Sequence, residues 1–407
     1  MTAARPLNAE LEGVRGLACL MVACSHVFYV THLDPTVTLP GWLHHLEAGQ
    51  TGVLVFFVLS GYLISWTNPG DCTAENRRAY LWRRFVRLGP IYYAALALTF
   101  AVLFWRRDPA PPSMVIALLA GAHNFNDYFG LHVPPPMVNG PLWSLNYEIL
   151  YYGLFILLWR FSPRLGWVFL PAAVATVLGW FTPQWMPLFL ASYACGWLYW
   201  AAGWWLARLP ELPATAPAPA AVTWLLLVFA GHQIGGMVRV LNALGLHSQD
   251  AGMVTLGQLG GLPAILLLLA AVTRRRLPGA VWLAALAWIS CVVPLAGMLW
   301  TGRLWSEPGW INGGIAVLLA VAALPIRSTG WLKSLAGLGR ISYAFYVVHF
   351  PMLFLVLLLP LPGGTLPAYL GRVLVWAVTS LALACFLELR LQPWAKARLS
   401  PPRSALT

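Results

Sequence analysis

Three ionisable side chains interrupt the first apolar stretch of the chain, LEGVRGLACLMVACSHVFYV (11–30), at Glu12, Arg15 and His26. An α-helix turns about 100° per residue, so Arg15 and His26 fall within about 20° of one face, about 16 Å apart along the axis. Glu12 lies one turn before Arg15 and can pair with it. An imidazole suits general-base chemistry, and a guanidinium suits an oxyanion or a phosphate. Charges inside an apolar helix indicate a reactive centre or a pathway; the alternative is a boundary ion pair and a satisfied interfacial histidine.

The next apolar stretch, GVLVFFVLSGYLIS (52–65), is interrupted by Ser60 and Gly61, with Tyr62 beside them. A glycine in such a helix permits close approach of a neighbour, and a serine can hydrogen-bond across the contact. We assign Ser60 and Tyr62 to a polar cavity, with helix packing as the alternative.

A basic segment, RRAYLWRRFVRLGP (77–90), follows and places Arg84 and Arg87 one turn apart on a helix. Two guanidinium groups at this spacing can grip phosphate oxygens bidentately. Basic clusters of this kind also fix membrane topology or contact anionic lipid, which is the alternative interpretation.

Two further stretches carry polar faces. PLWSLNYEILYYG (141–153) contains Trp143, Ser144 and Glu148. Glu148 has no Lys or Arg nearby in sequence, so we expect it to find a partner on another helix or to be protonated.

Later in the chain, LGRISYAFYVVHFP (338–351) places Ser342, Tyr346 and His349 at i, i+4 and i+7, with Tyr343 beside them. Several such faces in one bundle would line a polar cavity, whereas a single one could pack against its neighbours.

The composition indicates what holds these residues in place. Of 407 residues, 59% are hydrophobic and only 9% are charged, whereas soluble domains carry about 25% charged residues. The formal net charge of +12 comes from Lys and Arg in short segments between apolar runs, which is typical of membrane topology and argues against nucleic acid. The six cysteines form no CxxC pair or His/Cys cluster, so neither a disulfide framework nor a metal site is expected.

Apolar runs predict an all-α, polytopic bundle of about 10–12 transmembrane spans over a single domain, residues 1–407, with no soluble domain. We expect the first run to be a retained helix and the ten-residue run at 113–122 to dip into the bilayer without crossing it. The spans are expected near residues 11–30, 50–67, 89–105, 142–160, 166–182, 184–205, 220–236, 252–272, 279–300, 309–326, 341–360 and 366–388.

The distribution of Lys and Arg decides the orientation. If the N-terminus is cytoplasmic and 113–122 does not cross, most of the basic residues fall on the cytoplasmic side. If that run crosses, every later assignment flips and most of the charge lies outside. We therefore predict that both termini are cytoplasmic.

Five of these segments together resemble the acyltransferase 3 family. They are LEGVRG with the Arg15-x10-His26 spacing, FFVLSGYLI, RFVRLGP, WSLNYE and ISYAFYVVH, in this order, over about residues 8–355. Each motif is weak alone, and the set is specific. The resemblance implies a membrane O-acyltransferase of the plasma (inner) membrane that moves an acyl group, such as acetyl, from cytoplasmic acyl-CoA to a hydroxyl of an envelope or exported carbohydrate. Some relatives act on small molecules such as macrolides.

By this resemblance, Arg15 and His26 are the catalytic pair, with Glu148 assigned to the same reaction. Arg84 and Arg87 would bind the donor, acetyl-CoA, which is a co-substrate and not a bound cofactor. The other cavity residues carried over are Glu12, Ser60, Tyr62, Trp143, Ser144, Tyr343, Tyr346 and His349. Two positions depart from the family pattern: Glu12 stands where an Asp is usual, and Leu54 where an acidic residue is often found.

The expected mechanism places His26 as the general base for the acceptor hydroxyl, or as a transient acyl-imidazole, and Arg15 at the oxyanion or the donor. With the first helix running outward, His26 lies about 22 Å from its inner end, between a donor inside and an acceptor outside. A proton-coupled secondary transporter would also place Arg, His and Glu in the bilayer, and a lipid-binding scaffold would explain the basic loops alone. The sequence leaves the acceptor and the oligomeric state open.

Overall fold

The computed structural model describes residues 8–29, 33–121, 137–182, 188–213, 215–216, 220–246, 253–306 and 308–399. All regular elements in these residues are helical; the one extended feature is an isolated bridge between Glu211 and Arg275. The predicted all-α fold is thereby confirmed for the described chain.

In the part of the chain that the structure describes, seven helices are long and apolar enough to cross a membrane, or eight if α9 and α10, which meet at a 45° bend, form one span. Four further helices, α6, α7, α8 and α13, coincide with other apolar runs of the sequence but fall outside that group. The chain is therefore an integral, multi-pass membrane protein, and the count of 10–12 spans stays a prediction.

The helices divide into two compact units, which are described separately. Unit 1 contains Met1–Tyr29, Leu39–Pro69 and Ser162–Gly339, and unit 2 contains Val30–Thr38, Gly70–Phe161 and Arg340–Thr407.

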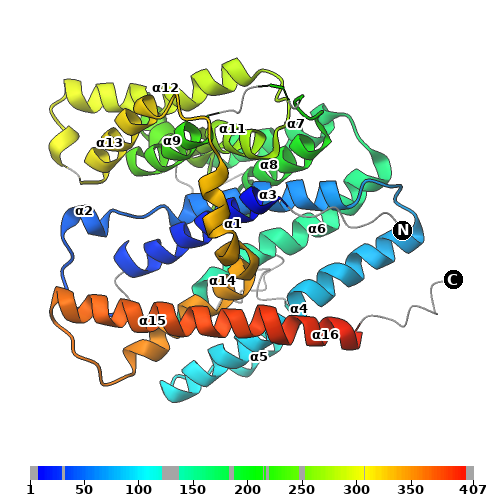
Figure 1. The fold of residues 1–407 in the computed structure, drawn as a ribbon, viewed down its shortest axis with the longest axis vertical. Coiled ribbons are helices and arrows are strands. Elements are labelled where there is room, and N and C mark those ends of the chain that lie inside the picture. The colour runs from blue at the N-terminus through cyan, green and yellow to red at the C-terminus, as the bar shows by residue number, and fades with distance from the viewer. Residues whose placement is uncertain are drawn as a thin grey trace. The chain divides into compact units, whose positions relative to one another are not determined.

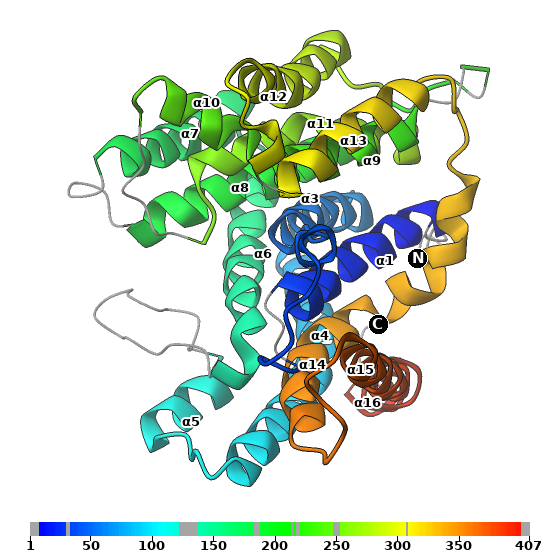
Figure 2. The same ribbon diagram turned by 90° about the vertical axis from the view of Figure 1, so that its left-hand side faces the viewer.

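Unit 1 is built around α1 and α3, which lie side by side in both ribbon views (Figures 1 and 2). α3 also packs along α8, and α9 packs against α11 and α13. The elements of unit 1 are α1 (Ala9–Cys24), η1 (Ser25–Tyr29), α2 (Gly41–His44), α3 (Gly49–Thr67), α7 (Leu165–Phe181), α8 (Leu188–Arg208), α9 (Ala221–Ile234), α10 (Gly236–Ala243), η3 (Leu256–Gly261), α11 (Leu262–Thr273), α12 (Ala280–Trp300), η4 (Leu304–Ser306), α13 (Pro308–Ala322) and η5 (Gly330–Leu335).

Glycines set the contact between α3 and α8. A Cβ atom at Gly61 would overlap the Trp200 carbonyl, and one at Gly203 would overlap the Val58 carbonyl. The two backbones therefore touch where each helix lacks a side chain, as small residues permit between membrane helices. The Ser60-Gly61 interruption in the sequence marks this crossing.

Unit 2 is organised along α4, a continuous 32-residue helix that contacts α5, η2, η6 and α16. At 1.5 Å per residue α4 is about 48 Å long, longer than the roughly 30 Å hydrocarbon layer, so its basic first turns can project beyond the lipid. The elements of unit 2 are α4 (Ala74–Trp105), α5 (Pro112–Leu119), η2 (Met137–Leu142), α6 (Trp143–Phe161), α14 (Ala336–Leu357, whose first turn belongs to unit 1), α15 (Leu366–Phe386), η6 (Leu387–Leu391) and α16 (Gln392–Leu399).

Local sequence explains where several helices begin. The Asn8 side chain accepts a hydrogen bond from the backbone of Glu10 at the start of α1, and Thr73 does the same for Asn76 at the start of α4. Both helices carry acidic residues in the first turn, where they complement the helix dipole.

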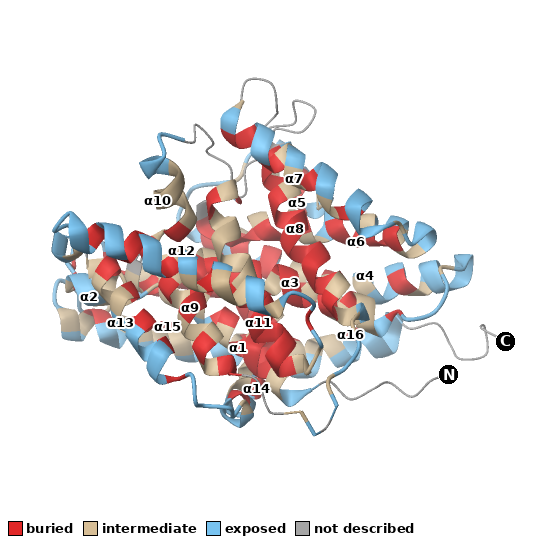
Figure 3. Ribbon diagram, turned by 90° about the horizontal axis from the view of Figure 1, so that it is seen from above, coloured by how far each residue is buried: buried red, intermediate tan, exposed pale blue. Residues whose placement is uncertain are grey.

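Burial separates core helices from helices that face outward. α11 is buried along most of its length, whereas α12 buries few residues and exposes large apolar side chains such as Trp282, Ile289 and Trp300 (Figure 3). A helix that is apolar all round yet exposed on one side is expected to contact lipid.

Candidate active site

The predicted pairing on α1 is confirmed. Arg15 donates from one guanidinium nitrogen to both carboxylate oxygens of Glu12, at 3.1 and 3.2 Å. Glu12 is buried, at 7% exposure, so its charge is compensated on its own helix. The glycines of LEGVRG serve packing, because a Cβ at Gly13 or Gly16 would overlap the backbone of η5. The motif therefore combines a close helix contact with an orientated guanidinium.

His26 lies in a π-helical turn, Ser25–Tyr29, that follows directly on α1. Such wide turns leave the regular i→i−4 hydrogen-bond pattern and are frequent at functional sites. The sequence predicted a regular helix over 11–30, and the structure replaces its last turn with this wider one. The imidazole is half-buried.

Ser60 and Tyr62 take part in helix contacts within unit 1. The Trp200 indole on α8 donates to the Ser60 hydroxyl at 3.3 Å, across the glycine crossing. Tyr62 is 5% exposed, with the Arg275 guanidinium 6.0 Å from its ring centre. These contacts support the packing interpretation, and a substrate role for either residue stays a prediction.

In unit 2, Arg87 is held by a carboxylate that the sequence analysis missed. Its guanidinium donates bidentately to Glu388 of η6, at 2.8 and 3.0 Å, and the Glu388 side chain is only 6% exposed. Glu388 also accepts from the backbone of Ala344 at 3.3 Å. A lone carboxylate after the apolar run 366–386 was the available signal, since such a group needs a partner.

Arg84, three residues earlier on α4, has a different environment. Its guanidinium lies 5.9 Å from the ring centres of both Tyr80 and Tyr152. Among the described residues it forms no ion pair, and its Nε is buried without a hydrogen-bond partner. The two arginines of the predicted donor site are thus unequal: Arg87 is neutralised within the protein and Arg84 is not.

Glu148 is half-buried on α6 and accepts a short hydrogen bond from the Tyr152 hydroxyl one turn later. Because Arg84 lies over the ring of Tyr152, a carboxylate and a guanidinium contact the same side chain from different helices. Trp143, at the start of α6, packs edge-on against Tyr147 at 5.3 Å. Arg15 and His26 belong to unit 1 and Glu148 to unit 2, so joint action of the three stays a prediction.

The two polar faces predicted on α6 and α14 do meet. The Tyr346 hydroxyl donates to the Pro141 carbonyl at 2.9 Å and lies 2.8 Å from the Ser144 hydroxyl, which can donate to it in turn. Nearby, Asn139, fully buried, donates to Thr99 at 2.9 Å and to the Val347 carbonyl at 3.3 Å. Sequence reasoning missed Asn139 and Thr99, whose residue types alone carry no signal.

The remaining residues of the α14 motif are packed tightly. Tyr343 donates to the Leu88 carbonyl at 3.1 Å and lies 5.3 Å from the Arg87 guanidinium. His349 is 1% exposed, stacks on Phe345, and contacts the Trp376 ring edge-on. Its Nδ1 lies 2.7 Å from the Tyr346 carbonyl, which can only accept, so Nδ1 carries the proton.

Within the part of the chain that the structure describes, no group of three or more His, Cys, Asp or Glu residues could hold a metal ion. The contact between His232 and the Glu47 carboxylate in unit 1 was also missed by the sequence analysis. The sequence feature that could have revealed this contact is an ionisable residue in an apolar run, which also applies to Glu388.

Fold and site together define the class of protein: a multi-pass helical membrane protein that holds an orientated guanidinium and an imidazole on its first helix and π turn. A family model described as an acyltransferase domain matches residues 8–388. The chain therefore belongs to the acyltransferase 3 family.

Among curated proteins, the chain is 26% identical over 157 residues to "Acyltransferase MdmB" of Streptomyces mycarofaciens. The match covers 37% of this chain and 39% of that relative, so it extends over well under half of the relative's length. No solved structure matches the chain.

Proposed function

We propose that the protein is an O-acyltransferase of the plasma membrane that moves an acetyl group from cytoplasmic acetyl-CoA to a carbohydrate hydroxyl on the opposite side. The observation that carries this proposal is the family match over residues 8–388, which includes Arg15 and His26. The orientated Glu12–Arg15 pair and the π turn at His26 support it.

In the proposed reaction, the His26 imidazole takes the proton of the acceptor hydroxyl while that oxygen attacks the thioester carbonyl. The tetrahedral intermediate collapses, the C–S bond breaks, and coenzyme A leaves as the thiol after taking up the proton. Arg15, already held in place by Glu12, stabilises the oxyanion without having to reorganise. If His26 instead accepts the acyl group itself, a burst of thiol release precedes the steady state.

Arg84 is the residue best placed to bind donor phosphate. A half-buried guanidinium without an ion pair gains a charge-assisted hydrogen bond when phosphate arrives, whereas Arg87 would first have to give up Glu388. Arg87 then acts by holding η6 and α14 against α4.

Thiol release from acetyl-CoA by purified protein tests the proposal, with methyl glycosides of common sugars and a macrolide as acceptors. We expect acceptor-dependent release in the wild type and loss of release in His26→Ala. Arg84→Gln should raise the KM for the donor, by a factor that becomes smaller as salt screens the wild-type contact, and saturating donor should restore its rate. No release with any acceptor in the panel would overturn the proposed function.

The proposed orientation has its own test, in a cysteine-free background. Ser162 and Ser306 are exposed; Ser162 lies between α6 and α7 along the chain, and Ser306 ends the short 3-10 turn η4 between α12 and α13. If both termini are cytoplasmic and 113–122 does not cross, Ser162→Cys should label with an impermeant thiol reagent from the cytoplasmic side and Ser306→Cys from outside. If position 162 labels from outside and position 306 from the cytoplasmic side, the run 113–122 crosses the membrane.

A further inference from the structure

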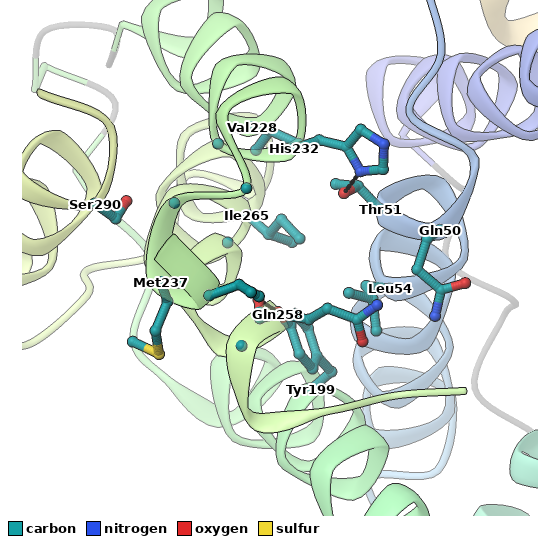
Figure 4. A pocket seen from close by; sticks show the side chains of 17 residues that line it. Gln50, Thr51, Leu54, Tyr199, Val228, His232, Met237, Gln258, Ile265 and Ser290 are labelled. Atoms are coloured by element: carbon teal, nitrogen blue, oxygen red, sulfur yellow. Dashed lines mark hydrogen bonds between the residues drawn. The ribbon is translucent and has the colours of Figure 1, made fainter. Parts of the chain in front are cut away.

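A partly enclosed cavity of about 190 Å³ lies within unit 1, where α3 begins, α9 ends, and η3 closes one side. Figure 4 shows Gln50, Thr51 and Leu54 of α3 on one wall and His232 of α9 facing them. Gln258 of η3 and Tyr199 of α8 line the cavity below His232 in this view. Among the described residues that line it, none is Lys, Arg, Asp or Glu.

A hydrogen-bonded chain of three side chains reaches the cavity wall. His232 Nε2 lies 2.8 Å from a carboxylate oxygen of Glu47, and His232 Nδ1 lies 2.9 Å from the Thr51 hydroxyl. When the carboxylate accepts from Nε2, a neutral ring leaves Nδ1 as an acceptor, so the Thr51 hydroxyl donates to it. The Thr51 oxygen, orientated in this way, can still accept a hydrogen bond from a ligand hydroxyl.

Gln258 supplies a complementary donor. Its side-chain oxygen accepts from the backbone of Thr255 at 2.9 Å in a capping box, which fixes the carboxamide. Among the described residues, no hydrogen bond uses its NH2 group. The cavity therefore presents a fixed acceptor, a fixed donor and apolar surface from residues such as Leu54 and Ile265.

Glycines keep the cavity open. α9 ends at Gly235, which adopts a left-handed conformation (φ 65°), and a Cβ at Gly236 would come within 2.5 Å of the Ser290 carbonyl. α9 can therefore bend by 45° into α10 and still approach α12. Gly260 and Gly261 of η3 also line the cavity, so much of its wall is bare backbone.

The same chain of contacts continues to the segment that carries His26. The Ser25 hydroxyl donates to the Glu47 carboxylate, and the Gln233 amide donates to the Glu47 carbonyl. Ser25 is the first residue of the π turn and immediately precedes His26. Glu47 thus joins the cavity wall, through His232, to the turn that holds the proposed base.

We propose that this cavity binds the acceptor, and that the acceptor group it takes is one neutral ring of monosaccharide size, held by Thr51, His232 and Gln258. The assignment rests on the function proposed above. A neutral sugar ring presents hydroxyls at its edge and C–H groups on its faces, which matches fixed polar groups between apolar side chains. The cavity volume of about 190 Å³ is below the roughly 300–1,000 Å³ of pockets that enclose drug-sized ligands, which suits a single ring.

Kinetics of Thr51→Val test the site. Removal of the hydroxyl at nearly constant volume should raise the acceptor KM about tenfold, the effect of one lost hydrogen bond, with the donor KM unchanged. Thr51→Ser should restore the wild-type KM. The matched control is Thr223→Val on α9, a buried threonine that bonds to the Ala320 carbonyl outside the cavity and should leave the acceptor KM unchanged.

A second measurement does not depend on turnover. Met237 lines the cavity, so Met237→Cys in a cysteine-free background should react with a thiol reagent, and saturating methyl pyranoside should slow that reaction. The Thr51→Val variant in the same background should lose the protection.

The outcomes separate the two proposals. Thiol release with an unchanged acceptor KM in Thr51→Val and no protection at position 237 would overturn the acceptor site and leave the proposed function standing. Protection at position 237 without thiol release from any donor would establish a sugar site and overturn the transferase proposal.

Discussion

Polar side chains gather in two regions of this protein, and they are used differently. Around the cavity of unit 1, Glu47, His232 and Thr51 form a chain that ends on open space. In unit 2, Tyr346 and Ser144 satisfy one another and a backbone carbonyl inside packed helices. In both regions the polar groups lie among apolar side chains.

This comparison shows that a polar face on a membrane helix is first of all evidence of a contact with another helix. It is evidence of a ligand-binding site only when a further observation supports one. Burying a hydroxyl or an imidazole without a partner is costly, so most such groups are hydrogen-bonded in a folded protein. A substrate can hydrogen-bond to such a group only when the last group of the hydrogen-bonded chain faces a cavity. By that criterion, the cavity region of unit 1 is better suited to binding, and the α6–α14 contact is better suited to holding helices together.

The largest expected effect contrasts one histidine from each unit. His26→Ala should reduce turnover by about 10²–10⁴-fold, the usual contribution of acid–base catalysis, with normal membrane insertion. His349→Phe preserves an aromatic ring beside Phe345 and Trp376 and should retain most of the activity. Acyl-transfer rates of the two purified variants check this. Comparable losses of activity in the two variants would place His349 in the reaction site and contradict the different roles of the two histidines.

The next effect concerns the two arginines of α4. Arg87→Gln leaves the Glu388 carboxylate buried without its partner, which should destabilise unit 2 by about 3 kcal/mol. Arg84→Gln breaks no ion pair and should leave the apparent Tm in detergent unchanged while raising the donor KM. The double variant Arg87→Gln, Glu388→Gln should regain part of the lost Tm. An equal fall in Tm for Arg84→Gln would contradict the unequal roles.

A smaller effect tests the packed region directly. Tyr346→Phe and Ser144→Ala each remove one side of a 2.8 Å hydrogen bond, so a double-mutant cycle should give a coupling of about 1 kcal/mol in stability. The KM values for donor and acceptor should stay at the wild-type level. A large rise in the acceptor KM for Tyr346→Phe would instead make this contact part of the binding site.

The smallest effect lies outside the spans, at Asp34 of unit 2. Hydrogen bonds from Thr36 and from the Gly364 backbone, with the nearby Arg372 charge, hold the pKa of Asp34 below its ordinary value. A lowered pKa in the folded state stabilises that state above the unfolded pKa of about 3.9, and this contribution is lost as pH falls through the folded value. Asp34→Asn should therefore lower the apparent Tm at pH 7. In strong acid, the Tm of the variant and that of the wild type should become equal. A Tm difference that does not change with pH would contradict the ionic origin.

The sequence by itself determined the helices, their membrane character and the candidate residues on each face. Hydrophobic length and i, i+3 spacing are local properties, so the Glu12–Arg15 pair and the Tyr346–His349 face could be predicted from the sequence. The π turn at His26 could not, because a one-residue change of winding leaves no mark in residue type.

Tertiary structure alone decided which polar groups are paired and which face open space. Glu388 lies 301 residues from Arg87, and His232 lies 185 residues from Glu47, so no local pattern connects the partners. The cavity likewise depends on where α3, α9 and η3 meet, with glycines at the points of closest approach. In a low-dielectric interior, the partner determines what a charged or polar side chain can do, and the partner is chosen by the fold.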